Sequence, residues 1–94
     1  MRFEWDERKN ERNRRKHRVS FDEAQTVFFD DNAVLYDHPD HSIDEERFLL
    51  LGVSSRLRVL VVVHVLRERG EVICIVSARR ATRLERREYQ RGKT

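Results

Sequence analysis

The stretch Arg58-Val-Leu-Val-Val-Val-His-Val-Leu66 decides the fold of this chain. It is almost entirely β-branched or aliphatic, contains no glycine or proline, and is too short to cross a membrane. Such a run is typical of a strand that is buried on both faces in the middle of a sheet. Alternation places His64 on the same face as Leu60 and Val62, with the odd-numbered valines on the other face. We therefore expect a neighbouring strand on each side of this run and a cover on at least one face.

Composition limits both the size of the fold and the kind of partner. The chain has 94 residues, which is enough for one modest core, so we expect a single domain over residues 1–94. Charged residues make up 39% of the chain and hydrophobic residues only 38%. The cations are 17 arginines against 3 lysines. Because the guanidinium group matches phosphate and carboxylate geometry, this bias favours a nucleic acid or an acidic protein as partner.

The single cysteine, Cys74, excludes an internal disulfide and is compatible with a reducing compartment. It alternates with Val72 and Val76, so we interpret it as a packing residue. The first residues, Met-Arg-Phe-Glu-Trp-Asp, contain no apolar stretch of the length that a signal peptide needs. We expect a cytoplasmic protein that does not associate with membranes.

The flanking sequence predicts an α+β fold with three helices. The first is polar on all sides, begins after an N-cap at Asp6, and runs to His17. Ser20-Phe-Asp-Glu23 and Thr82-Arg-Leu-Glu85 are capping boxes that open the second helix and a terminal helix, which runs to about Tyr89. The second helix carries an apolar stripe that can cover one sheet face: Phe21, Ala24, Val27 and Phe28.

Alternating segments predict strands over 2–5, 33–36, 46–52, 58–66 and 71–77. The last three are close enough in sequence to form a hairpin-linked antiparallel meander. The expected architecture is therefore a small, twisted, mainly antiparallel sheet with two helices on one face and a terminal helix at its end.

Motifs spread over nearly the whole chain share a common order and spacing. They are Phe3-Glu-Trp-Asp6, Lys9, Asn13, Lys16-His17, Val19-Ser-Phe-Asp-Glu-Ala24, Val27-Phe28, Asp37, His41, Glu46-Arg47, Gly52, Leu60-Val-Val-Val63, Ile75, Ser77-Ala-Arg79, Ala81-Thr82, Glu85-Arg86 and Tyr89. Together they resemble the BrnT family of toxins. Arg18 departs from the family pattern, in which a glycine usually follows Lys-His.

The resemblance implies a RelE-like fold and the toxin half of a type II toxin–antitoxin pair, which cuts RNA and arrests growth. It also implies an antitoxin of the BrnA type, with a ribbon-helix-helix DNA-binding part, that neutralises the toxin and represses the shared operon. DNA would then be contacted only through the toxin–antitoxin complex. No cofactor is expected.

RNA cleavage without a metal needs a group that helps to deprotonate the 2′-hydroxyl, cations on the phosphorane, and a proton for the leaving oxygen. Arginine suits the second task and histidine the first or third. We predict Arg47, His64 and His17 as catalytic residues. The predicted RNA-binding residues are Lys16, Arg79, Arg80 and Tyr89.

Each candidate also has a structural explanation. A histidine on an apolar strand, such as His64, is more often a core residue, and His17 more often provides a favourable charge at a helix C-terminus. Arg47 is equally typical of a surface ion pair. Arg79 is equally suited to bind Glu85 or the last carbonyl groups of its strand. The arginines of the terminal helix are typical of a solvated face: Arg83, Arg86, Arg87 and Arg91.

The expected register limits which candidates can act together. A turn at 67–70 that pairs Leu66 with Glu71 places His64 near Ile73 and Ser77 near Leu60, and the preceding hairpin places Arg47 near Val62. Arg47 and His64 then lie toward one end of the meander, and Arg58 and Arg79 lie toward the other, roughly 20 Å away. We expect either a long groove that holds several nucleotides or a division of these residues between RNA and antitoxin.

The polar segment 37–44 contains possible metal ligands, Asp37, His38, Asp40, His41 and Asp44, but their spacing fits no standard motif. Two functions stay open. The first is an endoribonuclease toxin, and the alternative is a non-catalytic basic module that binds RNA or protein.

Overall fold

The structure is a computed structural model that describes residues 1–37 and 46–92. Its elements in chain order are β1 (Arg2–Glu4), α1 (Glu7–His17), α2 (Phe21–Gln25), the 3-10 helix η1 (Thr26–Phe29), β2 (Val34–Asp37), β3 (Arg47–Val53), β4 (Val59–Arg67), the 3-10 helix η2 (Glu68–Gly70), β5 (Val72–Arg80) and α3 (Arg83–Gly92). The predicted α+β class is confirmed. No helix in the described ranges is both long enough and apolar enough to span a membrane.

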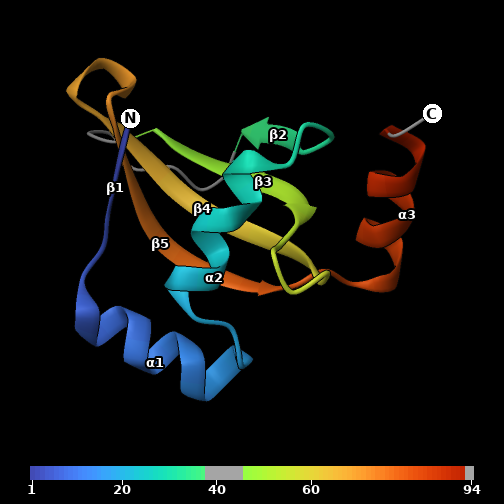
Figure 1. The fold of residues 1–94 in the computed structure, drawn as a ribbon, viewed down its shortest axis with the longest axis horizontal. Coiled ribbons are helices and arrows are strands. Elements are labelled where there is room, and N and C mark those ends of the chain that lie inside the picture. The colour runs from blue at the N-terminus through green and yellow to red at the C-terminus, as the bar shows by residue number, and fades with distance from the viewer. Residues whose placement is uncertain (38–45, 93–94) are drawn as a thin grey trace.

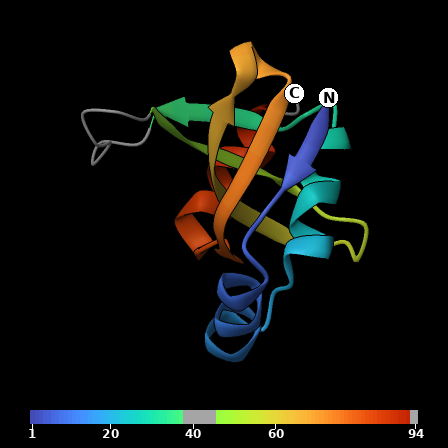
Figure 2. The same ribbon diagram turned by 90° about the vertical axis from the view of Figure 1, so that its left-hand side faces the viewer.

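The five strands form one mixed sheet in the order β1-β5-β4-β3-β2. β1 runs parallel to β5, whereas the other neighbouring pairs are antiparallel. β4 is the central strand, as its apolar sequence predicts. Figure 1 shows α2 in front of the sheet and α1 at one end of it. Figure 2 shows α3 on the side of the sheet opposite α2.

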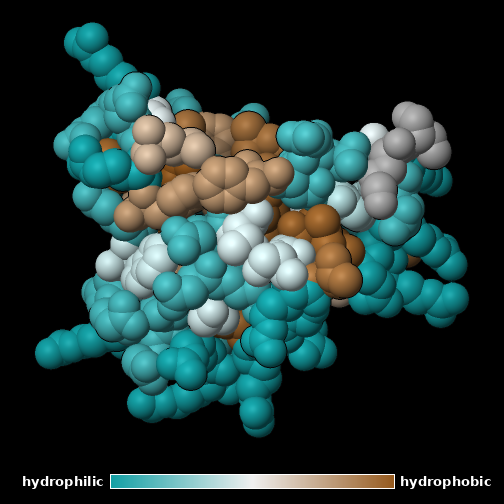
Figure 3. Space-filling model, viewed as in Figure 1, coloured by the Kyte–Doolittle hydropathy of each residue, from teal (hydrophilic) through white to brown (hydrophobic). Residues whose placement is uncertain are grey.

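Apolar side chains pack on both faces of the sheet, in line with the alternation predicted for β4. On the face covered by α2 and η1, hereafter the α2 face, the core consists of Val19, Phe21, Ala24, Val27, Leu50, Leu60, Val62, Ile75 and Ala78. On the opposite face, hereafter the α3 face, a smaller cluster consists of Leu51, Val61, Ala81 and Tyr89. Hydrophobic side chains also gather where β1 meets η1, as Figure 3 shows, and there Phe3 contacts Phe28 and Phe29.

Gly52 lets η1 pack closely against β3. A Cβ atom at this position would lie 2.9 Å from Val27 Cγ1 and 3.0 Å from both Ala33 Cβ and Asp30 Oδ2. Contacts this short are not tolerated, so only glycine allows the chain after α2 to lie on the sheet here.

The predicted strand register is wrong in both hairpins. Leu66 pairs with Ile73, not Glu71, because the η2 turn takes up the intervening residues with Glu68 and Arg69 at positive φ. The same register places His64 opposite Ile75, not Ile73, and a bulge between His64 and Val63 then places Ser77 opposite Val63 instead of Leu60. In the first hairpin the turn extends to residue 58, so Arg47 pairs with Val65 instead of Val62.

The first helix is polar in sequence and is held by polar contacts. Asp6 is its N-cap, as predicted, and accepts a hydrogen bond from the Arg8 backbone N–H at 2.8 Å. Asn10 and Asn13 are buried, and Asn10 Oδ1 accepts from the Phe21 backbone N–H at 2.9 Å. The helix therefore binds its neighbours with amide groups on the side where an amphipathic helix would carry apolar residues.

The capping box at Ser20 is only half formed. The Ser20 hydroxyl accepts from the Glu23 backbone N–H at 3.0 Å, as predicted. The Glu23 carboxylate instead accepts from the Ser54 hydroxyl at 2.6 Å and from the guanidinium of Arg58. Arg58 also donates to the Arg18 carbonyl at 3.1 Å. Arg58 thus ties the end of α1 to α2 and is a structural residue.

Candidate functional site

The alternation of β3 and β4 divides the predicted site residues between the two faces of the sheet. Arg47, Leu49 and Leu51 pair with Val65, Val63 and Val61 on the α3 face, and Phe48, Leu50 and Gly52 pair with His64, Val62 and Leu60 on the α2 face. In β5, Arg79 lies opposite Val61 and therefore belongs to the α3 face. Arg80 lies opposite Leu60 and belongs to the α2 face. The α3 face thus carries Arg47 and Arg79, and His64 lies on the other side of the sheet.

Arg47 is half-buried at the first position of β3. Its Nε atom is buried and has no hydrogen-bond partner in the described part of the chain. Tyr36 of β2 pairs with Leu49, so Tyr36 is the diagonal neighbour of Arg47 on the same face. Diagonal neighbours have Cβ atoms about 7–8 Å apart, within reach of two long side chains. The guanidinium of Arg47 and the phenol of Tyr36 are therefore within reach of each other at this edge of the α3 face.

His64 is a core residue and is only 2% exposed. Its ring lies 4.8 Å from the Phe28 ring and 5.8 Å from the Phe48 ring, and its Nδ1 atom lies 3.3 Å from the Val62 carbonyl oxygen. Burial lowers the pKa of His64 below its usual value, so the imidazole is neutral at pH 7. Arg47 and His64, which the sequence predicts as catalytic partners, thus lie at the same end of the sheet but on opposite faces, and the His64 ring is buried. The catalytic role of His64 stays a prediction.

His17 and Lys16 form the last turn of α1 together with Arg14 and Arg15. Lys16 is exposed and His17 is half-buried. This helix packs on β5 at Ala78, whose carbonyl oxygen accepts a hydrogen bond from Asn13. Arg47 and Cys74 both pair with Val65 of β4, so Arg47 lies at the level of Cys74 along β5. Four residues of strand, or about 13 Å, separate those two levels, so His17 and Lys16 do not join Arg47 in one site.

Arg79 forms a bidentate ion pair with Glu85 of α3. Its Nη1 and Nη2 atoms donate to the two carboxylate oxygens at 2.7 and 2.9 Å, and Nη1 also donates to the Arg80 carbonyl at 3.3 Å. Hydrogen bonds from Arg79 lower the pKa of Glu85 to about 2, and Glu85 in turn raises the pKa of Arg79. Both structural explanations that the sequence offers for Arg79 are thus realised. The side chain is still partly exposed, whereas Arg80 is fully exposed on the α2 face.

Tyr89 is an interior residue, 2% exposed, in the cluster beneath α3. Its hydroxyl donates to Asp30 Oδ2 at 2.6 Å, and that same oxygen accepts from the Val53 backbone N–H at 2.9 Å. Burial, together with the Asp30 carboxylate, raises the pKa of Tyr89 to about 12. Tyr89 joins α3 to η1 and β3, and its ring is buried in this structure. Its role in RNA binding stays a prediction.

A hollow of about 240 Å³ lies on the α3 face between α3 and the strands, hereafter the α3 hollow. It is lined by Tyr36, Leu49, Leu51, Val61, Glu85 and Glu88. Tyr36 and Leu49 place it next to Arg47, and Glu85 places it next to Arg79. The two arginines that share this face therefore lie on either side of one small cavity.

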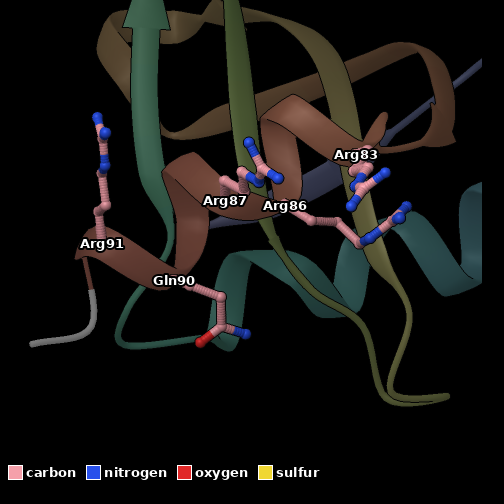
Figure 4. Close-up of a pocket in the computed structure, with 5 residues that line it drawn as sticks. All are labelled: Arg83, Arg86, Arg87, Gln90 and Arg91. Carbon is pink, nitrogen blue, oxygen red and sulfur yellow. The ribbon is translucent and has the colours of Figure 1, made fainter.

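The outward side of α3 carries a second basic surface. It is formed by Arg83, Arg86, Arg87, Gln90 and Arg91, and Figure 4 shows these side chains fanning out from the helix. At 100° per residue they share one helix face, while Glu85 lies on the opposite side of the helix and Glu88 lies at the border, 3.7 Å from Arg91. This surface, hereafter the arginine face, meets the α3 hollow at Glu88 and does not line it.

Tyr36 and Glu88 are not among the site residues predicted from the sequence. Tyr36 lies at the end of a short strand before a polar segment, and Glu88 looks like one more charge on a charged helix. The strand alternation assigns Tyr36 a face only once the pairing with Leu49 is known. The one signal in the sequence that could have assigned Glu88 to the site is its spacing from Glu85, because residues three apart share a helix face.

The possible metal ligands His38, Asp40, His41 and Asp44 lie outside the described residues. Within residues 1–37 and 46–92, no group of three histidine, cysteine, aspartate or glutamate side chains is placed to hold a metal ion.

Comparison with known proteins identifies the family. A search of curated proteins gives no match. Among solved structures, the fold is similar to the 1.1 Å crystal structure of the Brucella abortus ribonuclease toxin BrnT, with a TM-score of 0.67 and 22% identity over 88% of this chain and 99% of the other. The profile of the family described as "Ribonuclease toxin, BrnT, of type II toxin-antitoxin system" matches residues 5–85. The chain therefore belongs to the BrnT family of ribonuclease toxins of type II toxin–antitoxin systems.

Proposed function

We propose that this toxin is an endoribonuclease that cleaves RNA by attack of a 2′-hydroxyl on the adjacent phosphorus, without a metal ion, on its α3 face. Family membership supports the activity, and one observation carries the site: Arg47 and Arg79 share the α3 face on either side of a hollow. Arg47 and Arg79 lie on the two strands that flank β4, and their partners in β4, Val65 and Val61, are four residues apart. The backbones of the two arginines are therefore about 16 Å apart. That separation fits several nucleotides of one strand better than a single phosphate.

The chemistry assigned to Arg47 is electrostatic. The 2′-oxygen gives up its proton to water and attacks the phosphorus, which forms a P–O bond and a phosphorane with added negative charge. The bond from phosphorus to the 5′-oxygen then breaks and that oxygen takes up a proton from water, giving a 2′,3′-cyclic phosphate and a 5′-hydroxyl. A guanidinium that stays charged and binds two phosphate oxygens stabilises that charge. The partly buried position of Arg47 strengthens the interaction because the local dielectric constant is low.

Arg79 has a different role, since Glu85 already binds two of its donors. The pair holds the guanidinium in a fixed position while leaving it partly exposed. We assign Arg79 to the binding of an RNA phosphate away from the bond that is cut. Arg80 and Lys16 are exposed on other parts of the molecule and would contact RNA only outside this site.

The second half of the proposal concerns the partner. Membership of a type II system implies an antitoxin, and we propose one of the BrnA type, with a ribbon-helix-helix part through which the complex reaches DNA. An acidic segment as the neutralising element is supported by the arginine face and by a second surface, on which Arg14, Arg15, Arg18 and Arg56 outnumber the acidic Glu11 and Asp22.

The test is cleavage of purified RNA in EDTA, with analysis of the product ends. Wild-type protein should leave 2′,3′-cyclic phosphates, and Arg47→Ala should slow cleavage by a factor of about 10²–10³. Arg12→Ala, on the exposed side of α1, is the matched control and should cleave like wild type. His64→Phe, which keeps a ring between Phe28 and Phe48, should also remain active if histidine takes no part in the reaction.

Two results would overturn the proposal. One is the absence of cleavage in every RNA tested. The other is growth arrest that survives Arg47→Ala while RNA binding weakens, which would indicate the non-catalytic binding module. Activity lost in His64→Phe but retained in Arg47→Ala would reject the α3 face as the site.

A further inference from the structure

The α3 hollow has the shape and lining of a site for one planar ring. Its floor is aliphatic, formed by Leu49, Leu51 and Val61, of which the last two are almost fully buried. Tyr36 stands at the edge and is 39% exposed, so its ring can stack on a bound group. Single-stranded RNA is recognised by this combination, in which an unstacked base lies on an aromatic ring and its edge meets polar groups.

The charged groups that line the α3 hollow are both carboxylates. Glu85 is held by Arg79 and by the Thr82 backbone N–H at 2.8 Å. Glu88 has only an exposed contact with Arg91 at 3.7 Å in the described part of the chain, so its oxygens remain available to a ligand. An ionised carboxylate accepts hydrogen bonds and donates none. A base that binds here must therefore present donors toward Glu88.

Guanine is the base that meets this requirement. Its Watson–Crick edge presents the N1–H and the N2 amino group side by side, and one carboxylate can accept from both. Adenine and cytosine place a ring acceptor beside their amino donor, and uracil places one N–H between two carbonyl oxygens, so each would bring an acceptor against Glu88. We propose that the α3 hollow is a guanine-specific base site, with Tyr36 as the stacking residue and Glu88 as the residue that reads the base.

This inference rests on the proposed function, because it assumes that RNA lies on the α3 face beside Arg47. It adds a preference for guanine next to the phosphate that Arg47 binds. It also explains why a basic toxin carries two acidic side chains on the face where RNA is proposed to lie: there they would select a base, while the arginines bind the backbone.

The experiment measures binding of pentanucleotides that carry 2′-fluoro riboses and so cannot be cleaved by 2′-hydroxyl attack. The three probes are U-U-G-U-U, U-U-A-U-U and U-U-I-U-U, where inosine lacks only the N2 amino group of guanosine. Wild-type protein should bind the guanosine probe about tenfold more tightly than either of the others. In Glu88→Gln this preference should fall to within about twofold. Glu71→Gln, an exposed carboxylate at the opposite end of β5, is the matched control and should keep the preference.

Tyr36 gives an independent readout. Tyr36→Ala should weaken all three probes by a similar factor, because stacking tolerates every base, and Tyr36→Phe should restore binding. Equal affinity of wild-type protein for the three probes would overturn the inference, as would a guanine preference that survives Glu88→Gln.

Cleavage assays on unmodified RNA separate this inference from the proposed function. Guanine-selective binding without cleavage would reject the proposed function and retain the base site. Cleavage without any guanine preference, unchanged in Glu88→Gln, would retain the proposed function and reject the base site.

Discussion

Asn13 of α1 binds both backbone polar groups of Ala78 in β5. Its Oδ1 atom accepts from the Ala78 N–H at 3.1 Å, and its Nδ2 atom donates to the Ala78 carbonyl at 2.8 Å and to the Val19 carbonyl at 2.8 Å. β1 pairs with β5 only from Val72 to Cys74, so Ala78 lies beyond that pairing. Asn13 therefore satisfies backbone groups that a neighbouring strand would otherwise satisfy, and it anchors a helix without apolar residues.

Replacement of Asn13 by alanine should lower the free energy of unfolding by about 3 kcal/mol, because three buried hydrogen bonds are lost and their partners are left unsatisfied. Urea denaturation followed by circular dichroism measures this change. Arg12→Ala, on the exposed side of the same helix, should change stability by less than about 0.5 kcal/mol. A loss below about 1 kcal/mol in Asn13→Ala would show that water replaces the amide group at little cost.

Arg18→Gly should stabilise the protein by about 1 kcal/mol. Arg18 ends α1 with φ 60° and ψ 31°, a left-handed conformation that costs a side-chain-bearing residue more than glycine. The departure from the family pattern seen in the sequence is thus a strained helix end that keeps its left-handed geometry. Arg15→Gly, inside the helix, should instead destabilise by about 1 kcal/mol, and a thermal melt of the two variants gives the comparison. Equal effects in both variants would contradict strain at Arg18.

Tyr89→Phe should lower the free energy of unfolding at pH 7 by about 1–2 kcal/mol, because Asp30 loses a buried donor. The pKa of Tyr89 is raised from 10.0 to about 12 in the folded state. The stabilisation from this proton is therefore complete below pH 10 and is lost as the pH rises toward 12. Denaturation at pH 7, 10 and 12 should show the difference between wild type and Tyr89→Phe shrinking over the upper interval.

Because many groups titrate above pH 10, the change in free energy of unfolding caused by Tyr89→Phe needs a control at an exposed tyrosine. Tyr36→Phe provides it, since Tyr36 is 39% exposed on the α3 face. Its difference from wild type should stay small and constant over the same pH range.

Glu85→Gln should remove a contribution to the free energy of unfolding that is lost at low pH. Hydrogen bonds from Arg79 lower the pKa of Glu85 to about 2 in the folded state, against an ordinary value of 4.5. The contribution is therefore present above pH 4.5 and is lost as the pH falls toward 2. At pH 7 the variant should be less stable by about 1–2 kcal/mol, a figure reduced for the partial exposure of both groups. Urea denaturation at pH 7 and pH 2.5 measures the difference, and Glu88→Gln, which removes an exposed carboxylate from the same helix, is the control and should change stability little.

Charge reversal on the arginine face should separate antitoxin binding from catalysis. The double variant Arg83→Glu/Arg87→Glu should weaken the complex with the proposed antitoxin by at least about tenfold, with a smaller salt dependence, because two exposed cations on one helix face are inverted. Cleavage of RNA should be unchanged, since these side chains point away from the α3 hollow. Lys9→Glu/Arg12→Glu on α1 is the matched charge control. If Arg83→Glu/Arg87→Glu binds the antitoxin with wild-type affinity, the arginine face takes no part in the complex.

Local sequence determined most of the fold. The central strand, the N-caps at Asp6, Ser20 and Thr82, and the strand and helix order depend on residue types within a few positions of one another, so they can be predicted without knowing what packs on them. The partial burial of Arg79 against Glu85 was likewise one of two alternatives that the sequence offered.

Only the tertiary structure decided which candidate residues share a site. A pairing of Arg47 with Val62 would have placed Arg47 on the face of His64, but the pairing with Val65 is shifted by three residues. Because side chains alternate with a period of two, an odd shift moves a whole strand to the other face. The length of the turn between β3 and β4 sets that shift, and a bulge between β4 and β5 sets the level of Arg79; neither follows from hydrophobic periodicity. The sequence by itself therefore specified the elements and the chemistry they carry, whereas the strand register placed Arg47 and Arg79 on one face and the packing of α3 brought Glu88 to it.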